Sequence, residues 1–172
     1  MMCSIGRIAD INLQVAHRDD APVLLNLLEL YSHDFSEFCS VAIGEDGKFG
    51  YKGLDEYWSL PERHPFIIKA DGQLAGLALV RRGSPISGDP GVWDMTEFFV
   101  LRGYRRRGVG TLAAREVWRR FPGSWQVCIM QSNSIAGLFW QHALPTLMRP
   151  PTFRMHLAAD GKRWNVISFE SG

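Results

Sequence analysis

The chain has 172 residues, of which 46% are hydrophobic and 22% charged, and its formal net charge is +1. This length is typical of one domain that buries about 70% of the surface of its unfolded chain. A near-neutral charge argues against a general attraction to nucleic acid or to an anionic membrane. No apolar run approaches the roughly 20 residues that span a bilayer. We therefore expect one globular domain over residues 1–172 that binds neither nucleic acid nor membrane.

The cysteines and histidines indicate no metal site. The three cysteines, Cys3, Cys39 and Cys128, are odd in number and lack metal-ligand spacing, and reduced thiols are the default for such a pattern. His17, His64, His142 and His156 show no ligand spacing either. Residues 1–10 carry one arginine and no long apolar core, unlike a secretory signal. We expect a cytoplasmic protein.

The first sixty residues predict a strand and two helices. Residues 11–15 alternate apolar and polar side chains, as a strand does. A helix then begins at the acidic pair Asp19–Asp20 and Pro22 and continues through Tyr31 with apolar residues at helical spacing. The stretch 32–51 is irregular, and a short helix over 54–60 follows it and ends before Pro61.

The middle of the chain predicts three strands and a helix. Strands over 65–70 and 73–81 form a hairpin around Asp71–Gly72, a favoured two-residue turn. After a loop over 83–91, a strand over 93–101 leads through a turn into a helix over 108–121. Helical spacing places four apolar side chains of this helix inward: Val109, Leu112, Ala113 and Val117.

The last third predicts a strand over 125–130, a helix over 134–143 capped by Asn133 and ended by Pro145, and two strands over 153–157 and 164–169. The complete order is strand, helix, short helix, hairpin, strand, turn and helix, strand, helix, and two strands. It predicts an α/β fold in which a mixed central sheet of about six to seven strands is flanked by about four helices.

The most informative segment is the turn over 105–111, which reads R-R-R-G-V-G-T. A helix N-terminus leaves about four amides without internal partners and carries about half a positive charge. Glycines let a phosphate approach these amides, and the arginines beside them add charge-assisted donors. The segment therefore predicts a pyrophosphate-binding loop.

Arg105, Gly108 and Gly110 fit the spacing R-x-x-G-x-G, and the segment matches neither the dinucleotide fingerprint nor the Walker loop. This spacing resembles the pyrophosphate loop of the GNAT superfamily of N-acetyltransferases. The order of elements is similar to that of the family over almost the whole chain, and the combination E-F-F-V-L-R-x-Y-R-R-x-G-V-G, F-P-G-x-W and F-W resembles a bacterial branch of predicted acetyltransferases. The resemblance implies a single-domain GNAT fold, splayed between the fourth and fifth strands, that moves an acetyl group from acetyl-CoA directly to an amine.

The resemblance also implies which residues bind acetyl-CoA. The turn would hold the pyrophosphate, while the end of the fourth strand and the helix over 134–143 would hold the pantetheine arm. The implied residues are Phe98, Phe99, Val100, Arg105, Arg106, Arg107, Gly108, Val109, Gly110, Thr111, Asn133, Ala136 and Trp140. Asn133 is equally explained as a helix N-cap.

Trp140 departs from the family pattern, because many relatives have at this position a tyrosine that acts as general acid toward the departing thiolate. An indole N–H does not usefully release its proton at neutral pH. The acid is therefore absent or supplied by water or another side chain.

Two carboxylates, Asp94 and Glu97, are candidates for the general base that deprotonates the amine. Alignment on F-F-V with polyamine acetyltransferases places their catalytic glutamate at Thr96. Strand alternation predicts Asp94 and Thr96 on one face and Glu97 on the opposite face. Each candidate is also explained as a structural carboxylate that pairs with an arginine or caps a loop.

The first helix and the segment after it should form the acceptor side, with Tyr31, His33 and Asp34 as substrate-binding candidates. The neighbouring stretch mixes acids with aromatics: Phe35, Glu37, Phe38, Glu45, Asp46, Tyr51, Tyr57 and Trp58. This composition suits a small-molecule or peptide amine through ion pairing and cation–π contact, and it suits equally an aromatic cluster beneath a long loop. A homodimer is expected by analogy with relatives.

Two rival functions stay open. A non-catalytic acyl-CoA-binding regulatory domain is favoured by Trp140 and would bind the cofactor without turnover. A small nucleic-acid-binding module would use the arginines at 105–107 and 115–120, but the near-neutral net charge argues against it.

Overall fold

The computed structural model describes residue 8 and residues 10–144, 150–158 and 160–172, so Pro145 and Cys3 lie outside the described part of the chain. Seven strands form one sheet in the order β1-β2-β3-β4-β5-β7-β6. The strands are β1 (Ile11–Val15), β2 (Arg63–Ala70), β3 (Gln73–Arg82), β4 (Trp93–Val100), β5 (Gly123–Met130), β6 (Thr152–Leu157) and β7 (Arg163–Ser171). The helices are α1 (Ala21–Phe35), α2 (Glu56–Ser59), α3 (Val109–Arg120) and α4 (Ser134–Ala143), with 3₁₀ turns η1 (Arg18–Asp20) and η2 (Arg102–Tyr104).

The predicted α/β architecture is confirmed, including the hairpin of β2 and β3 and the order of all the main elements. The pair β4–β5 is parallel, and the other five neighbouring pairs are antiparallel. Helix α1 is longer than predicted and continues to Phe35, whose ring packs 5.6 Å from that of Tyr31. The extra turn brings Asp34 to Arg102 and Arg105, which follow the end of β4.

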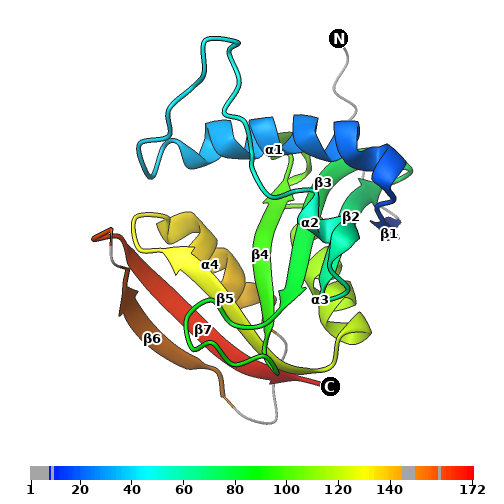
Figure 1. Ribbon diagram of the computed structural model, residues 1–172. Helices are drawn as coiled ribbons and strands as arrows, with labels where there is room; N and C mark the ends of the chain where they lie inside the picture. Colours follow the sequence, from blue (N-terminus) through cyan, green and yellow to red (C-terminus); the bar gives the residue numbers. More distant parts are fainter. Residues whose placement is uncertain (1–7, 9, 145–149, 159) are drawn as a thin grey trace.

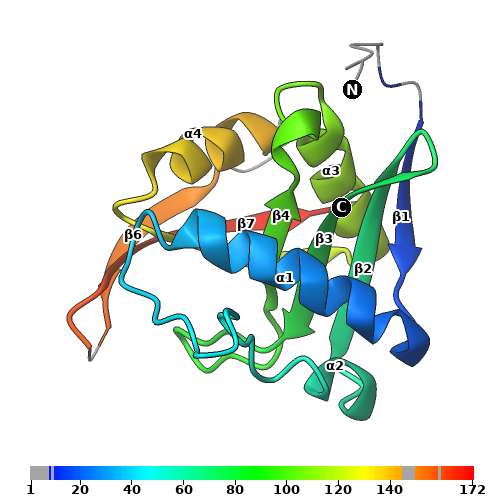
Figure 2. The same ribbon diagram turned by 90° about the horizontal axis from the view of Figure 1, so that it is seen from above.

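The sheet is covered on both faces. Figure 1 shows α1 above the sheet, while α3 and α4 lie on the other side, and Figure 2 shows α1 crossing the strands at an angle. Helices α1 and α2 pack Leu24, Leu28 and Tyr57 against one face of β3 and β4. Helices α3 and α4 pack against the opposite face. None of the described helices is both long enough and apolar enough to cross a membrane.

One prediction for α3 is wrong. Leu112, which helical spacing places inward, is 52% exposed, whereas Ala114 and Trp118 are buried with Val109, Ala113 and Val117. The buried stripe therefore lies further around the helix than the apolar spacing indicates. Leu112 lies beside residues 10–13 at the edge of the sheet.

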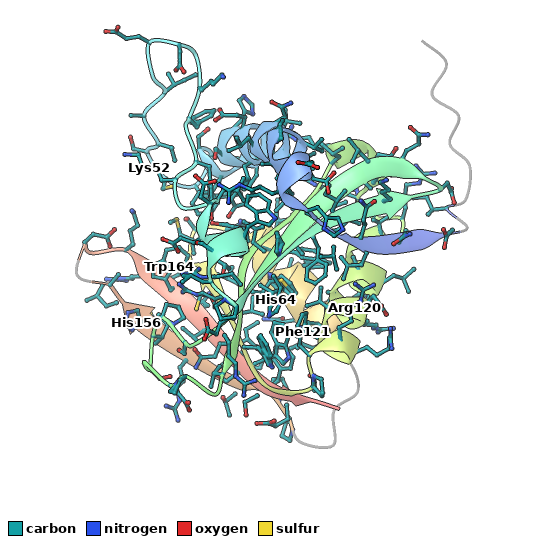
Figure 3. The ribbon with its side chains drawn as sticks, turned by 45° about the vertical axis from the view of Figure 1, so that its right-hand side comes forward. Lys52, His64, Arg120, Phe121, His156 and Trp164 are labelled. Carbon is teal, nitrogen blue, oxygen red and sulfur yellow. The ribbon has the colours of Figure 1, made fainter. Side chains whose placement is uncertain are left out.

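His64 belongs to an aromatic cluster between the sheet and the end of α3. Its ring lies 4.7 Å from that of Phe121 and 5.6 Å from that of Trp93. Figure 3 shows His64 beside Phe121 and Arg120. Burial lowers the pKa of His64, so the half-buried ring is neutral at physiological pH and packs against these aromatic side chains.

Candidate active site

The sheet opens between β4 and β5. These two strands pair only at Trp93 with Trp125 and at Asp94 with Gln126. On its other edge β4 stays paired with β3 as far as Val100. The part of β4 from Met95 to Val100 therefore presents one edge that β5 does not use, as the resemblance implied (Figure 1). A second chain of amides, such as a pantetheine arm, has the donors and acceptors to pair there.

The turn before α3 has the backbone shape that the glycine pattern predicts. Arg106 and Gly108 have positive φ angles of 57° and 84°, and α3 begins at Val109. The amide of Leu112 donates to the carbonyl of Gly108 at 3.0 Å, so the amides of residues 109–111 precede the helical ladder and have no acceptor within it. A Cβ built on Gly108 meets no atom within 4 Å, so the space beside this residue is open.

Gly110 has a packing role that the sequence interpretation missed. A Cβ on this residue would lie 3.0 Å from Cε2 of Phe139 and 3.5 Å from Cγ2 of Val100. The ring of Phe139 stacks in turn on that of Phe98 at 5.8 Å. Gly110 therefore lets α3 and α4 approach each other next to the open edge of β4, whatever it does toward a phosphate.

Arg105 points toward α1 rather than to solvent in front of the helix. Its Nε donates to the carbonyl of Val100 at 2.7 Å, and its guanidinium forms an ion pair with Asp34. Arg102 donates to the same carboxylate from Nε at 3.1 Å and from Nη2 at 2.7 Å. Arg106 is exposed, and Arg107 donates to the carbonyl of Gly103 at 3.3 Å. Arg102 and Arg105 thus join the end of α1 to the turn before α3.

The three candidate acceptor residues, Tyr31, His33 and Asp34, lie in different surroundings. Burial raises the pKa of Asp34, but hydrogen bonds from Arg102 and Arg105 outweigh it and hold the pKa below its usual value. This carboxylate is therefore neutralised internally. The side chain of His33 is 73% exposed, and its ring lies near that of Phe49. Of the three candidates, Tyr31 is the one that reaches the interior, where its ring packs on that of Phe99.

The prediction that Asp94 and Glu97 lie on opposite faces of β4 is wrong. Opposite Leu79 stands Glu97, and opposite Val80 stands Met95, so Thr96 is an extra residue that bulges from the ladder. Asp94 lies opposite Arg81. Because Leu79 and Arg81 are two residues apart on β3, they share a face, and so do their partners Glu97 and Asp94.

Glu97 lies on the α1 side of the sheet among tyrosines. The hydroxyl of Tyr51 donates to its Oε1 at 3.1 Å, and the hydroxyl of Tyr31 also hydrogen-bonds the carboxylate. Burial raises the pKa of Glu97 to about 7, and the charge of Asp94 adds to the rise, against the two tyrosines and Arg81. A carboxyl group with this pKa is ionised in about half of the molecules at neutral pH. The ionised form is the one that can accept a proton as a general base.

Asp94 is the more deeply buried carboxylate, at 2% exposure. Its Oδ2 accepts from Nε of Arg81 at 2.9 Å and from Oγ1 of Thr96 at 3.2 Å. Burial raises the pKa of Asp94, while Arg81 and Thr96 oppose the rise. A carboxylate held by a cross-strand arginine has the geometry of a structural ion pair, which was the alternative explanation for this residue.

Asn133, Ala136 and Trp140 lie at α4 as expected, and each of them has a structural role there. Oδ1 of Asn133 accepts from the amide of Ala136 at 3.0 Å, which confirms Asn133 as the N-cap. Ala136 packs at the margin of the core. Trp140 is 6% exposed and contacts the rings of Phe98, Trp118 and Phe139. Its indole thus serves the core beneath the open edge of β4.

Sequence reasoning did not identify four residues that form contacts in this region: Glu29, Tyr51, Arg81 and Arg102. Arg81 had a signal, because aligning the antiparallel runs over 73–81 and 93–101 places an arginine near Asp94. Tyr51 appeared only within an acidic and aromatic stretch. Glu29 and Arg102 carried no signal, since their partners are set by how a long loop and a helix end meet the sheet.

Comparison with known proteins agrees with this geometry. The family model described as acetyltransferase (GNAT) family matches residues 24–142. An acetyltransferase from Thermus thermophilus is similar in structure, with a TM-score of 0.69, 15% identity, and coverage of 96% of this chain and 99% of that one. The aminoglycoside acetyltransferase AAC(6')-Ib in complex with coenzyme A has a TM-score of 0.65, 18% identity, and coverage of 91% of this chain and 94% of that one.

A spermidine N-acetyltransferase from Vibrio cholerae, in complex with CoA and spermine, also has a TM-score of 0.65, with 11% identity and coverage of 94% of this chain and 95% of that one. A search of curated protein sequences found no match. The likeness to the solved structures shows a shared fold, and the family model covers more than half of the chain. The chain therefore belongs to the acetyltransferase (GNAT) family.

Proposed function

We propose that this acetyltransferase transfers an acetyl group from acetyl-CoA directly to an amine, with Glu97 as the general base. The observation that carries the assignment of the base is the position of Glu97. It is a partly buried carboxyl group on the part of β4 that has separated from β5, and its pKa is raised to about 7. An ionised Asp94 on the same face is already paired with Arg81, so Glu97 is the carboxylate available for proton transfer.

Proton transfer to Glu97 is easier from some amines than from others. An alkylammonium group has a pKa near 10.4 and an α-amino group one near 7.7–8.0. Moving a proton to a group of pKa about 7 then costs roughly 4–5 kcal/mol for the alkylammonium and about 1 kcal/mol for the α-amino group. An acceptor with an amine of low pKa therefore suits this base best.

Three carboxylates on the acceptor side are already held within the protein, whereas Glu37 and Glu45 are exposed on the segment after α1. Asp34 is held by Arg102 and Arg105, and Asp94 is held by Arg81. Glu29 accepts two backbone amides. Together with the preference of Glu97 for an amine of low pKa, this arrangement suits a small-molecule or peptide acceptor that presents one amine beside an apolar or aromatic group.

The residues fit acetyl-CoA as the donor. The amides of residues 109–111 and the guanidinium groups of Arg106 and Arg107 would hold the pyrophosphate. The free edge of β4 at residues 98–100 would pair with the pantetheine arm, beside Asn133, Ala136 and Trp140. Bound acetyl-CoA supplies a thioester whose carbonyl the amine attacks. In this proposal Arg105 stays paired with Asp34 and links the end of α1 to the turn before α3.

Direct attack is favoured over an acyl-enzyme. Cys128 lies on β5 near the pair Asp94–Arg81, and burial raises the pKa of its thiol to about 12, with Asp94 adding to the rise. Such a thiol is protonated at neutral pH and is a poor nucleophile. In direct transfer the amine nitrogen bonds to the thioester carbonyl carbon and the C–S bond breaks. Glu97 takes the proton that the amine loses, and the CoA thiolate that leaves is protonated by water.

We propose a cytoplasmic location for the protein. Cys39 and Cys128 are free thiols, which fits this location.

We also propose that two copies form a homodimer through β6. This edge strand exposes Phe153, Met155 and Leu157, which would suit contact between the two copies.

A non-catalytic acyl-CoA-binding domain is the second candidate, and the observation that favours it is the buried Trp140 in place of a tyrosine acid. An assay of CoA thiol release distinguishes the enzyme from the binding domain. Purified protein is incubated with acetyl-CoA and single amines: an amino-acid amide, a peptide with a free N-terminus, an aromatic monoamine, an aminoglycoside and a polyamine. Acceptor-dependent release that Glu97→Gln abolishes supports the enzyme with this base. Acetyl-CoA binding without release on any acceptor supports the binding domain.

A further inference from the structure

Glu29 on α1 holds the backbone just before Tyr51. Its Oε2 accepts from the backbone amide of Phe49 at 2.7 Å, and its Oε1 accepts from that of Gly50 at 2.8 Å. The next residue along the chain is Tyr51, whose hydroxyl donates to Glu97. One carboxylate on α1 is thus connected through two residues of backbone to the carboxylate proposed as the general base.

The contact has the form of a specific anchor rather than a chance surface contact. Two successive amides donate to the two oxygens of one carboxylate, and Gly50 has a φ of 67° that turns the backbone there. Such concave pairs of amides bind anions, and hydrogen bonds to an ionised acceptor are about twice as strong as neutral ones. Glu29 and Phe49 are both partly buried.

The segment between α1 and α2 needs such an anchor because it is long and irregular. Residues 36–55 contain no helix or strand and arch away from the sheet before they return to α2 (Figure 1). Lys52 marks the returning part in Figure 3. Near the start of the segment, the carbonyl of Phe38 accepts from the hydroxyl of Ser132 at 3.2 Å. Of these two contacts, the one made by Glu29 lies nearer in the chain to Tyr51, which hydrogen-bonds Glu97.

We propose that Glu29 is a positioning residue for the reaction: by binding the amides of Phe49 and Gly50, it holds Tyr51 over Glu97 as both a hydrogen-bond donor and a cover against water. This inference rests on the proposed role of Glu97 as general base. Glu29 itself touches no reacting atom.

The surroundings of Glu97 give the proposal a measurable consequence. The groups that face it are Tyr31 on α1, Tyr51 on the segment, Tyr57 on α2, Arg81 on β3 and Asp94 on β4. Arg63 on β2 acts on Tyr51, Tyr57 and Asp94. Burial is the largest cause of the raised pKa of Glu97, and the hydroxyl of Tyr51 opposes it. The ring of Tyr51 and its hydroxyl therefore act on this pKa in opposite directions.

Two substitutions separate these effects. Tyr51→Phe keeps the cover and removes the donor, so the pKa of Glu97 should rise by about one unit. Glu29→Ala releases both the cover and the donor. Because burial is the largest cause of the raised pKa, the entry of water should outweigh the lost donor, and the pKa should fall by about one unit toward its ordinary value. Both are measured on the free protein by the pH dependence of the side-chain carboxyl ¹³C signals of ¹³C-glutamate-labelled samples, in which Glu97→Gln assigns the signal.

Glu45→Ala is the matched control, because Glu45 is an exposed glutamate of the same segment, and it should leave the pKa of Glu97 unchanged. A Glu29→Ala protein that keeps the wild-type pKa while Tyr51→Phe shifts it would overturn the proposal. Glu29→Gln keeps the shape of the side chain and one acceptor oxygen, and it provides a folded variant with a smaller fall if Glu29→Ala does not fold.

The titration is independent of the acceptor and of turnover. If Glu29→Ala lowers the pKa but Glu97→Gln retains full thiol release, the positioning contact is real and the assignment of Glu97 as base is wrong. If Glu97→Gln is inactive and Glu29→Ala changes neither pKa nor rate, the base is right and the positioning role is wrong.

Discussion

The hydroxyl of Tyr51 lies 3.1 Å from Oε1 of Glu97, although 46 residues separate the two in the chain. Tyr51 comes from a long loop and Glu97 from the strand that opens the sheet. The contact brings a loop onto a rigid strand at the point where an amine would have to lose its proton. Loops carried by a rigid scaffold are where proteins commonly place binding residues.

Removing the carboxylate of Glu97 should slow acetyl transfer most at neutral pH. Glu97→Gln keeps the shape of the side chain and should lower kcat/KM by about 10²–10⁴-fold at pH 7, the usual contribution of a general base. The loss should shrink at pH 9, where more of the amine is already unprotonated. Wild-type kcat/KM should rise with pH through an apparent pKa of about 7. A Glu97→Gln protein with an unchanged pH profile would show that the proton leaves by another route.

The same substitution should stabilise the protein at alkaline pH. Glu97 has a folded pKa of about 7, above its ordinary value of 4.5, so the folded state binds more protons between these values than the unfolded state. Wild-type stability should then fall as pH rises from about 4.5 to 7, by at most roughly 3 kcal/mol. Urea unfolding should show Glu97→Gln gaining on wild type across this window. Parallel stability curves would mean that the carboxyl group is hydrated in the folded protein.

Asp94→Asn should affect stability and the pKa of Glu97 together. It leaves Arg81 without its charged partner, and breaking a buried ion pair costs about 3–5 kcal/mol, less here because the side chain of Arg81 is 23% exposed. The charge of Asp94 raises the pKa of Glu97, so its removal should move the acid limb of the rate profile to lower pH. A variant of full stability that has lost activity would instead assign Asp94 as the base.

Asp34 should make stability depend on pH in the acid range. Burial raises the pKa of this carboxyl, but Arg102 and Arg105 hold it below the ordinary value of 3.8. A lowered folded pKa means stability that is present above the unfolded pKa and is lost as pH falls through the folded one. Urea unfolding of Asp34→Asn should therefore show a deficit at pH 7 that shrinks below about pH 4. A constant deficit would mean that the arginines do not pair with this carboxylate in solution.

How far the sequence predicts the structure depends on the range of the contacts. The strands, the hairpin at Asp71–Gly72 and the turn at Gly108 follow from local pattern and are found as predicted. The bulge at Thr96 is set by pairing with β3, so alternation along β4 alone assigns Glu97 to the wrong face. Asp34 looked available for a substrate because its partner Arg102 is 68 residues away.

The glycines of the turn show the same limit. Gly108 has the positive φ that its pattern indicates, and open space beside it. Gly110 is confined by Phe139 from α4, a contact that no local pattern reports. Gly110→Asp would disturb packing as well as any phosphate, so Gly108 is the better position at which to test cofactor binding.

The most direct test of the account is a calorimetric titration of acetyl-CoA into the wild-type protein and into Gly108→Asp and Gly108→Asn. Asp and Asn tolerate positive φ about equally well, so the two variants share the backbone effect and differ in charge next to the proposed pyrophosphate site. We predict micromolar binding to wild type, a modest loss in Gly108→Asn and no detectable binding in Gly108→Asp. Equal affinity of the two variants, or no binding to folded wild-type protein, would contradict the assignment of this turn as the acetyl-CoA site.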